Sequence, residues 1–479
     1  MSERKAIVTN TISQVLVRII GLGIAIVSVK LLTSNLGTAG MGQYNTIATY
    51  LGFCVILADL GLFSTSVREI TRHPEKEAQI MRNLLYLRLI TAVLATLVAA
   101  GAIFLTDYSA TVKQATVITS GFIFFNLLSG IFDVTLQTRL KMQFSALAEF
   151  AAKLLGLLLL WVLVRADASF LLIAATLPIG AGLITLAKWI AARRFFSTRQ
   201  GTSIDRDLLR WMLITTIPLG MVYAINSIFF KIDNLLVSSI QGDSAAGIYA
   251  VAYKVLEVSL FIGSYFASAL KPSLSRSVGT NPKEAGKTVE FGIVVMLVLA
   301  TPITIASLVF APEIISLLSD ASFSTGAAAL SVLGAVLPLL YLDMLLGEIL
   351  VAADARKQLL IVAGSMLAIN LTLNLLIIPR YSFIGAAWVT LTCEALLVII
   401  NLVLTRKYAV YRLPFAAIAG IISAAALMYA SAHYLQPTSL HFILILILAT
   451  AVYAAALVGF RVINLRNIKN LLTKQPVVS

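Results

Sequence analysis

The stretch GTAGMGQY, residues 37–44, returns in altered form as GDSAAGIY at residues 242–249. Both stretches read G-x-x-x-x-G-x-Y, both follow a Leu-Leu pair, and they lie 205 residues apart. A glycine-rich turn between two apolar runs can either cradle a phosphate or join two helices. A phosphate loop needs a preceding strand and a lysine in the motif, and the sequence offers neither here. The stretch therefore predicts a tight connection between helices that occurs twice in the chain.

The composition around these turns indicates a membrane protein. Of the 479 residues, 59% are hydrophobic and only 12% are charged, and the mean hydropathy is +0.95. Soluble domains carry about 25% charged residues. Apolar stretches long enough to cross about 30 Å of hydrocarbon recur along the chain. We therefore expect an all-α polytopic protein of the cytoplasmic (inner) membrane, whose first span is not a cleaved signal peptide.

The sequence predicts fourteen transmembrane helices, with the N- and C-termini in the cytoplasm. With this orientation, 26 of the 36 Lys and Arg residues fall on the inside and only 4 on the outside, as the positive-inside rule requires. The net charge of +14 then reflects topology and anionic lipid contacts, and no nucleic-acid-binding domain is expected. The expected spans are 11–33, 42–64, 84–106, 112–134, 146–165, 169–191, 211–236, 247–270, 289–310, 328–352, 358–379, 383–405, 414–434 and 440–461.

The spans themselves repeat. Shifting the first three by 205 residues places them almost on the seventh, eighth and ninth, and the next three match with a slightly larger shift. This predicts two parallel six-helix bundles, an N-lobe (1–200) and a C-lobe (201–408), followed by two additional transmembrane helices and a cytoplasmic tail (409–479). Two such lobes around a central cavity are typical of alternating-access transporters, although a scaffold is an alternative.

Ionisable residues inside the predicted spans are the candidate functional residues, because charges within a bilayer are costly. Five cations would suit an anionic cargo, above all a diphosphate: Arg18, Lys30, Arg88, Lys153 and Lys254. Four acids are candidates for ion coupling or for the cavity: Asp59, Glu257, Asp343 and Glu394. The alternatives are purely structural roles for these charges. A long side chain can snorkel to the interface, or two charges can pair along one helix, for example Glu149 with Lys153 or Lys254 with Glu257.

Several chemical functions are not expected. Cys54, Cys393 and the three histidines are scattered, so we predict no metal site and no cofactor. The segment KEAGKT, 283–288, is not an ATP-binding loop, because Asn281 stands where that motif needs glycine. No outside loop is long enough to carry the catalytic groups of a membrane glycosyltransferase or polymerase. We therefore expect a transporter and not an enzyme.

Three motifs resemble one transporter family. The first is the run from Val29 to Arg72, with its turn at 37–44, the D-L-G-L stretch at 59–62 and the pair Arg68-Glu69. The second is KIDNLLVSSIQGDSAAGIYAVAYKV at 231–255, and the third is IPRYSFIGAAWVT at 378–390, where Ser382 replaces the usual glycine. Together they resemble the polysaccharide and O-antigen flippases (Wzx-type) of the multidrug/oligosaccharidyl-lipid/polysaccharide (MOP) exporter superfamily.

The resemblance implies a function and a set of partners. It implies a flippase for undecaprenyl-diphosphate-linked oligosaccharides, serving O-antigen, capsule or exopolysaccharide synthesis, with a cationic cavity and coupling to a proton or sodium gradient. The partners would be the lipid-linked oligosaccharide, membrane lipids, and polysaccharide polymerase and chain-length proteins. A multidrug or cation antiporter and a peptidoglycan lipid-precursor flippase of the same superfamily are the alternatives.

Overall fold

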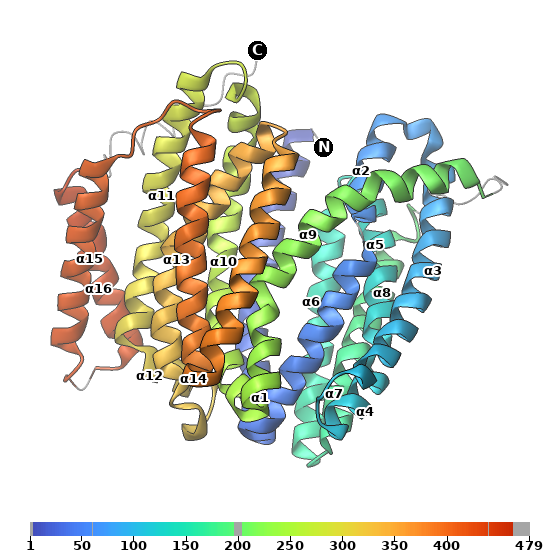
Figure 1. The fold of residues 1–479 in the computed structure, drawn as a ribbon, viewed down its shortest axis with the longest axis horizontal. Coiled ribbons are helices and arrows are strands. Elements are labelled where there is room, and N and C mark those ends of the chain that lie inside the picture. Colours follow the sequence, from blue (N-terminus) through green and yellow to red (C-terminus); the bar gives the residue numbers. More distant parts are fainter. Residues whose placement is uncertain (1–2, 60, 196–203, 439, 463–479) are drawn as a thin grey trace. The chain divides into compact units, whose positions relative to one another are not determined.

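The structure is a computed structural model, and it describes residues 3–59, 61–195, 204–438 and 440–462. Side chains are described in these ranges except at 3–20 and at 218–219. Every regular element of this part of the chain is a helix, in agreement with the predicted all-α class (Figure 1). The chain divides into two compact units. Unit 1 comprises Met1–Ala250 and Leu318–Ser322, and unit 2 comprises Val251–Leu317 and Phe323–Ser479.

Unit 1 contains the first nine α-helices and the first turns of the tenth. The α5 helix packs against α3 and α8, and α6 packs against α1 and α8. The elements are α1 (Glu3–Asp59), α2 (Leu62–Arg72), η1 (Pro74–Lys76), α3 (Glu77–Ala102), η2 (Ile103–Leu105), α4 (Ala110–Thr119), α5 (Gly121–Thr138), α6 (Met142–Arg165), α7 (Phe170–Ala174), α8 (Thr176–Ala192), α9 (Arg206–Gln241) and α10 (Asp243–Ser277).

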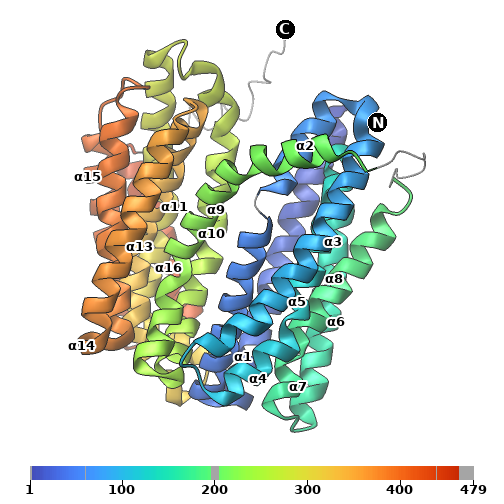
Figure 2. The same cartoon turned by 45° about the vertical axis from the view of Figure 1, so that its right-hand side comes forward.

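Unit 2 contains the rest of α10 and the remaining helices. The α13 helix lies between α11 and α14, and the α15–α16 hairpin packs against α11, as the views in Figures 1 and 2 agree. The hydroxyl of Tyr453 on α16 donates a hydrogen bond to the carbonyl of Val298 at 3.2 Å. The elements are α11 (Pro282–Val309), α12 (Ala311–Leu318), η3 (Ala321–Phe323), α13 (Gly326–Ala352), α14 (Arg356–Thr405), α15 (Phe415–Leu435) and α16 (Phe442–Gly459).

The number of spans depends on two sharp reversals. Twelve helices of the described chain are long and apolar enough to cross a membrane, but two of these run for 52 and 50 residues. At 1.5 Å per residue, each of the two would be about 75 Å long if straight, more than twice the hydrocarbon thickness. Each instead breaks at one residue, Gly37 in α1 and Ser382 in α14. Counting the two arms of each helix separately recovers the fourteen predicted spans.

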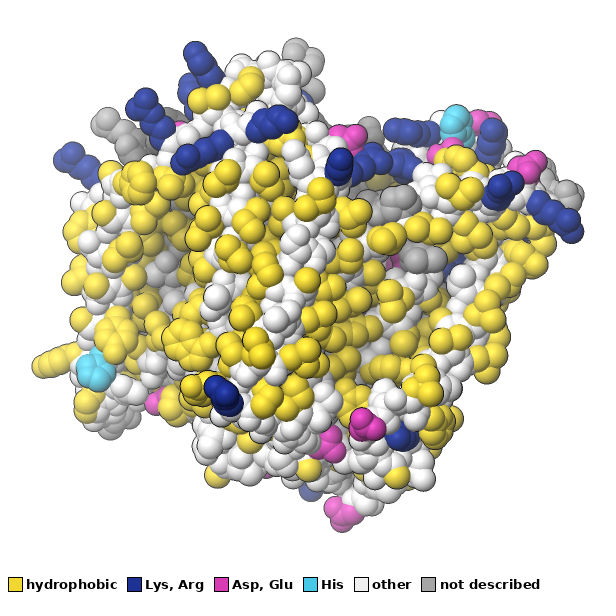
Figure 3. Space-filling model, viewed as in Figure 1, with side chains coloured by type: hydrophobic (Ala, Val, Ile, Leu, Met, Phe, Trp, Pro, Cys, Tyr) yellow, Lys and Arg dark blue, Asp and Glu magenta, His cyan; other side chains and the backbone are white. Residues whose placement is uncertain are grey.

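The surface of the helices matches the predicted membrane setting. Hydrophobic side chains cover their middle parts, and Lys and Arg side chains gather at one end of them (Figure 3). Large apolar side chains stand open to the surroundings, including Leu97, which is 64% exposed. The protein is therefore a multi-pass membrane protein. The cytoplasmic placement of the termini remains a prediction. The division at residues 200 and 408 also remains a prediction, because the two compact units are defined by packing and not by the sequence repeat.

The Ser382 reversal stores backbone strain. Ser382 adopts φ 52° and ψ −146°, a region that is nearly exclusive to glycine. The equivalent break in α1 uses Gly37, at φ 62° and ψ −171°, where the absence of a Cβ removes the clash. The family pattern places glycine at the Ser382 position. Although serine stands there in this chain, the turn is still sharp, because the serine adopts the backbone conformation that glycine would have.

Replacing Ser382 with glycine is expected to stabilise the protein. The strain relieved is about 1–3 kcal/mol, so Ser382→Gly should raise the melting temperature in detergent. The matched control is Ser365→Gly on the exposed side of the same helix, which should lower stability by about 0.5–1 kcal/mol because glycine is a poor helix former. Equal destabilisation by both substitutions would show that the turn is unstrained.

Candidate functional site

Two of the predicted charges form an ion pair inside unit 1. Asp59, at the end of α1, accepts a hydrogen bond from Nη2 of Arg88 on α3. The second oxygen of Asp59 accepts from the backbone N–H of Gly61 at 3.0 Å. Gly61 has a φ of 77°, so the chain turns sharply there before α2 begins. The carboxylate thereby links the helix break to the buried arginine.

The two members of this pair differ in accessibility. The Arg88 side chain is 1% exposed, whereas that of Asp59 is 33% exposed. Within the described chain, Nε and Nη1 of Arg88 have no hydrogen-bond partner. Gly130 on α5 lies beside the guanidinium, where a Cβ would be in ordinary van der Waals contact with Nη2 at 3.6 Å. A buried guanidinium with two unpaired nitrogens calls for water or an anion beside it, whereas Asp59 is the more accessible member of the pair.

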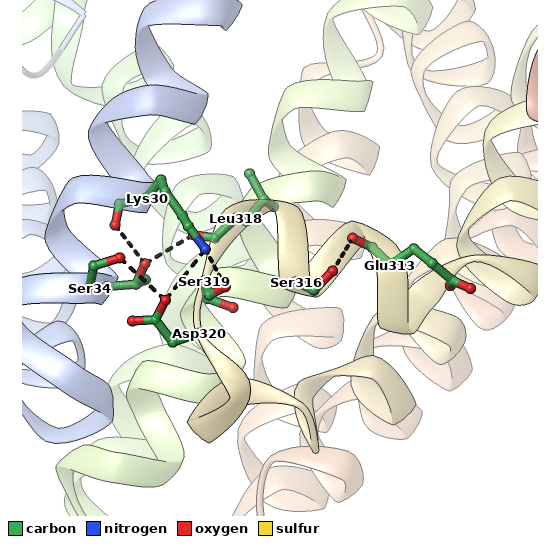
Figure 4. Close-up of polar contacts among 8 residues, drawn as sticks. Lys30, Ser34, Glu313, Ser316, Leu318, Ser319 and Asp320 are labelled. Carbon is green, nitrogen blue, oxygen red and sulfur yellow. Dashed lines mark hydrogen bonds and ion pairs between the residues drawn. The ribbon is translucent and has the colours of Figure 1, made fainter. Parts of the chain in front are cut away.

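Lys30 lies near the Gly37 turn and is also paired. Its Nζ donates to the carbonyl of Ser319 at 2.6 Å and lies 3.4 Å from Oδ1 of Asp320 (Figure 4). Ser34 donates to the same carboxylate oxygen, and Thr33 donates to the carbonyl of Leu318. The α1 arm is thus fastened to the segment Leu318–Ser322, which belongs to the same unit. The ion pair is half exposed, so it contributes little stability by itself.

Lys254 and Glu257 form the third pair, in unit 2. Lys254 Nζ lies 2.7 Å from Glu257 Oε2, one turn further along α10. Their side chains are 42% and 29% exposed, respectively, so both remain open to a solute. The proposed pairing along one helix face is therefore confirmed by the geometry for these two residues, and the accessible lysine is the one that an anion could reach.

The suggested pairing of Glu149 with Lys153 is wrong. Glu149 Oε1 on α6 instead lies 2.7 Å from Nζ of Lys188 on α8, and Asp133 Oδ2 on α5 lies 2.7 Å from the same nitrogen. Ser145 donates to the other oxygen of Asp133 at 2.6 Å. The reason is packing: α8 lies against both α5 and α6, so a lysine on α8 reaches two carboxylates at once. Lys153 is exposed and makes no ion pair within the described chain.

This Lys188 triad was missed among the candidate residues. Lys188 is 5% exposed and holds α5, α6 and α8 together through two carboxylates. The signal available in the sequence was a lysine inside the predicted span 169–191 with no acid near it on that span. Its partners, Asp133 and Glu149, lie on two other predicted spans, so no sequence spacing connected them to Lys188.

The last two predicted acids lie close together in unit 2. Asp343 on α13 accepts a hydrogen bond from Nδ2 of Asn401 at 2.7 Å. Glu394 on α14 is 2% exposed, and the two carboxyl groups are close enough for their charges to interact. Two buried oxygens of this group have no donor within the described chain: Glu394 Oε2 and Asn401 Oδ1. Such a set of acceptors suits a proton or a small cation.

Two further points complete the placement of the predicted residues. The Arg18 side chain lies outside the described residues. The described residues contain no group of three His, Cys, Asp or Glu side chains able to hold a metal ion.

The comparisons with known proteins decide the family. The family described as polysaccharide biosynthesis protein matches residues 7–278, more than half of the chain. The chain belongs to this family. The MatE family also matches this chain, over residues 218–376. No curated protein matches it.

Solved structures confirm the fold of this chain. A "Lipid II flippase MurJ, inward closed conformation" matches with a TM-score of 0.76 and 15% identity, covering 95% of this chain and 99% of that one. An inward-facing multidrug resistance MATE family transporter of the MOP superfamily matches with a TM-score of 0.67 and 15% identity, covering 80% of this chain and 93% of that one. A MOP superfamily transporter from Pyrococcus furiosus matches with a TM-score of 0.63 and 15% identity, covering 84% of this chain and 95% of that one. The predicted MOP fold is confirmed.

Removing the lysine of the Lys188 triad should destabilise the protein. Lys188→Met leaves two carboxylates facing each other without their cation, and breaking such a buried pair costs about 3 kcal/mol. The melting temperature in detergent should therefore fall clearly. Lys153→Met, on the exposed face of α6, is the matched control and should stay near the parent value. Equal melting temperatures for the two variants would contradict a fastening role for Lys188.

Proposed function

We propose that this protein flips undecaprenyl-diphosphate-linked oligosaccharides from the inner to the outer leaflet by alternating access. The observation that carries the proposal is the match of the polysaccharide biosynthesis family over residues 7–278. The likeness to a lipid II flippase supports a fold able to move a lipid-linked head group, and shows no more than the fold. The sugar head group would cross through the protein while the lipid tail stays in the bilayer.

The accessible cations are the proposed contacts for the diphosphate. Arg88 is buried behind Asp59, and Lys30 is engaged by Ser319 and Asp320, so neither offers its donors directly. Lys254 is 42% exposed and can turn toward a solute. We therefore assign the first contact to Lys254, together with Arg18, which the sequence places at membrane depth. Charge-assisted hydrogen bonds to phosphate are the strong ones.

The Lys254–Glu257 pair offers a route to cargo-dependent rearrangement. A diphosphate that binds Lys254 competes with Glu257 for the same ammonium group, whose distance from the carboxylate is 2.7 Å. Release of the cargo would restore the pair. The buried acids Asp343 and Glu394 are the candidate site for the coupling ion, with oxygens of Glu394 and Asn401 that have no donor within the described chain.

A drug or cation antiporter is the nearest rival. The MatE match over residues 218–376 favours it, as does the partly exposed carboxylate of Asp59. A cationic drug would need accessible acids, whereas a diphosphate needs accessible bases. The two functions therefore differ in which charge change impairs transport. A glycosyltransferase, a polymerase or a scaffold for glycan assembly would show no transport of either cargo.

Neutralising both proposed contacts should impair flipping. Each lost charge-assisted contact costs about 1.5–3 kcal/mol, so Arg18→Gln with Lys254→Gln should lower the flipping rate by at least about tenfold. The assay is the movement of a fluorescent lipid-linked oligosaccharide in proteoliposomes. Lys357→Gln, an exposed lysine at the start of α14, is the matched control. Unchanged flipping by the double variant would overturn the assignment, and export of a cationic drug with no glycan flipping would favour the rival.

Neutralising Glu257 should tighten cargo binding. In the parent protein, the carboxylate of Glu257 competes with the diphosphate for Lys254. In Glu257→Gln this competitor is absent, so the dissociation constant of the lipid-linked oligosaccharide, measured in detergent, should fall. Glu348→Gln, which removes a carboxylate paired with Lys271, is the control. An unchanged dissociation constant for Glu257→Gln would rule out this competition.

A further inference from the structure

The two glycine-rich turns that mark the repeat have the same backbone geometry. Gly37 has φ 62° and ψ −171°, and Gly242, 205 residues later, has φ 85° and ψ 173°. Both conformations are essentially open to glycine alone. At each turn one helix ends and the next begins within a residue or two. We call these turns the first elbow (residues 37–45) and the second elbow (residues 242–249).

The two elbows pack against each other within unit 1, and the contact is reciprocal. A Cβ on Gly42 would lie 1.8 Å from the carbonyl oxygen of Asp243, and a Cβ on Gly247 would lie 1.9 Å from that of Thr38. Thr38 and Asp243 are 205 residues apart, as are Gly42 and Gly247, so each glycine meets the counterpart of its own neighbour. Distances this short leave no room for any side chain. Backbone lies directly on backbone.

Polar bonds surround the glycine contact. Thr38 and Ser244 are joined through their hydroxyl oxygens at 3.3 Å, and Gln43 donates to Asp243 at 2.9 Å. Asn45 donates to Asn234 at 3.1 Å, just before the second elbow. Tyr108 donates to the carbonyl of Leu235 at 3.2 Å. These bonds are exposed or half-buried, and among them only Asp243 carries a charge.

The contact is therefore tight but can be parted. Among the described residues, separating the elbows breaks no buried ion pair, unlike separating Asp59 from Arg88 or Lys188 from its carboxylates. The fit depends on shape, because two glycines allow approach to backbone distance. A steric seal held by exposed or half-buried hydrogen bonds is what a surface needs if it has to close completely and still open during each cycle.

We propose that the contact between the two elbows is a gate that closes the transport path at the end of the helices where the elbows lie. We further propose that Gly42 and Gly247 set the balance between the closed and open states of this gate. The inference rests on the proposed transport cycle, but it holds for any cargo. The elbows would be closed while the opposite end is open, and they would separate to release the cargo. Any side chain at either glycine would act as a wedge that favours the open state.

The first test measures gate opening without a cargo. In a background with Cys54→Ser and Cys393→Ala, Asn45→Cys reports on the gate through its labelling by a membrane-impermeant maleimide. Gly42→Ala and Gly247→Ala should each speed labelling by about tenfold, which corresponds to a shift of about 1.4 kcal/mol toward the open state. The double variant should add little, since one wedge already parts the surfaces.

The control for the wedge is Gly52→Ala, on the same helix, where a Cβ would meet nothing within 4 Å. Its labelling should equal that of the parent. If folded Gly42→Ala and Gly247→Ala proteins also label at the parent rate, the glycines do not govern the gate and the proposal fails.

The second test locks the gate, and it can be done even if the Gly42→Ala and Gly247→Ala proteins do not fold. Thr38→Cys with Ser244→Cys replaces two oxygens that are 3.3 Å apart, close enough for small side-chain rotations to form a disulfide. Oxidation should slow Asn45→Cys labelling and stop flipping, and reductant should restore both. Oxidised single-cysteine variants are the controls. Continued labelling and flipping with the disulfide formed would make the elbows a fixed pivot, and failure to cross-link would contradict the contact, so either result overturns the gate.

If the lock slows labelling while the unlocked parent flips no glycan, the gate stands and the proposed cargo is wrong. The two proposals therefore fail separately.

Discussion

Charge within a medium that cannot hydrate it is the constraint on which this structure depends. A bilayer supplies no water to replace a lost partner, so each buried polar group needs a protein partner or an enclosed ligand. Asp59 meets Arg88, and Lys188 meets two carboxylates at 2.7 Å each. These contacts join helices far apart in the sequence, so charge neutralisation and helix packing are satisfied by the same residues.

Two groups of residues in the proposed transport machinery are not both buried and fully paired. Buried oxygens of Glu394 and Asn401, beside Asp343, have no donor within the described chain. Lys254 and Glu257 are paired but open to their surroundings. Idle oxygens and accessible charges suit partners that come and go, such as a phosphate, a proton or a small cation.

Sequence reasoning succeeded wherever the evidence was local or periodic. Runs of apolar residues and the alternation of Lys and Arg predicted the spans, including the separate arms on either side of Gly37 and Ser382. The partners of the intramembrane charges could not be predicted in the same way. Arg88 lies 29 residues from Asp59, and Lys188 lies 55 residues from Asp133, so their pairing depends on which helices touch. The i,i+4 spacing of Glu149 and Lys153 looked sufficient but lost to a lysine on a neighbouring helix. Spacing of i,i+3 held for Lys254 and Glu257, whose helix presents both on one accessible face.

The reciprocal seating of Gly42 and Gly247 has a consequence for how the duplicated halves can diverge. For each glycine, the nearest atoms that a side chain would meet belong to the backbone of the other repeat. A side chain gained in one half cannot be accommodated by a smaller residue in the other, because the other position is already glycine. The sequences of the two halves can change freely where they face lipid, but at this contact the backbone of each half restricts the residue allowed in the other. The resemblance between residues 37–44 and 242–249 is therefore a mechanical requirement of the present molecule as well as a trace of its origin.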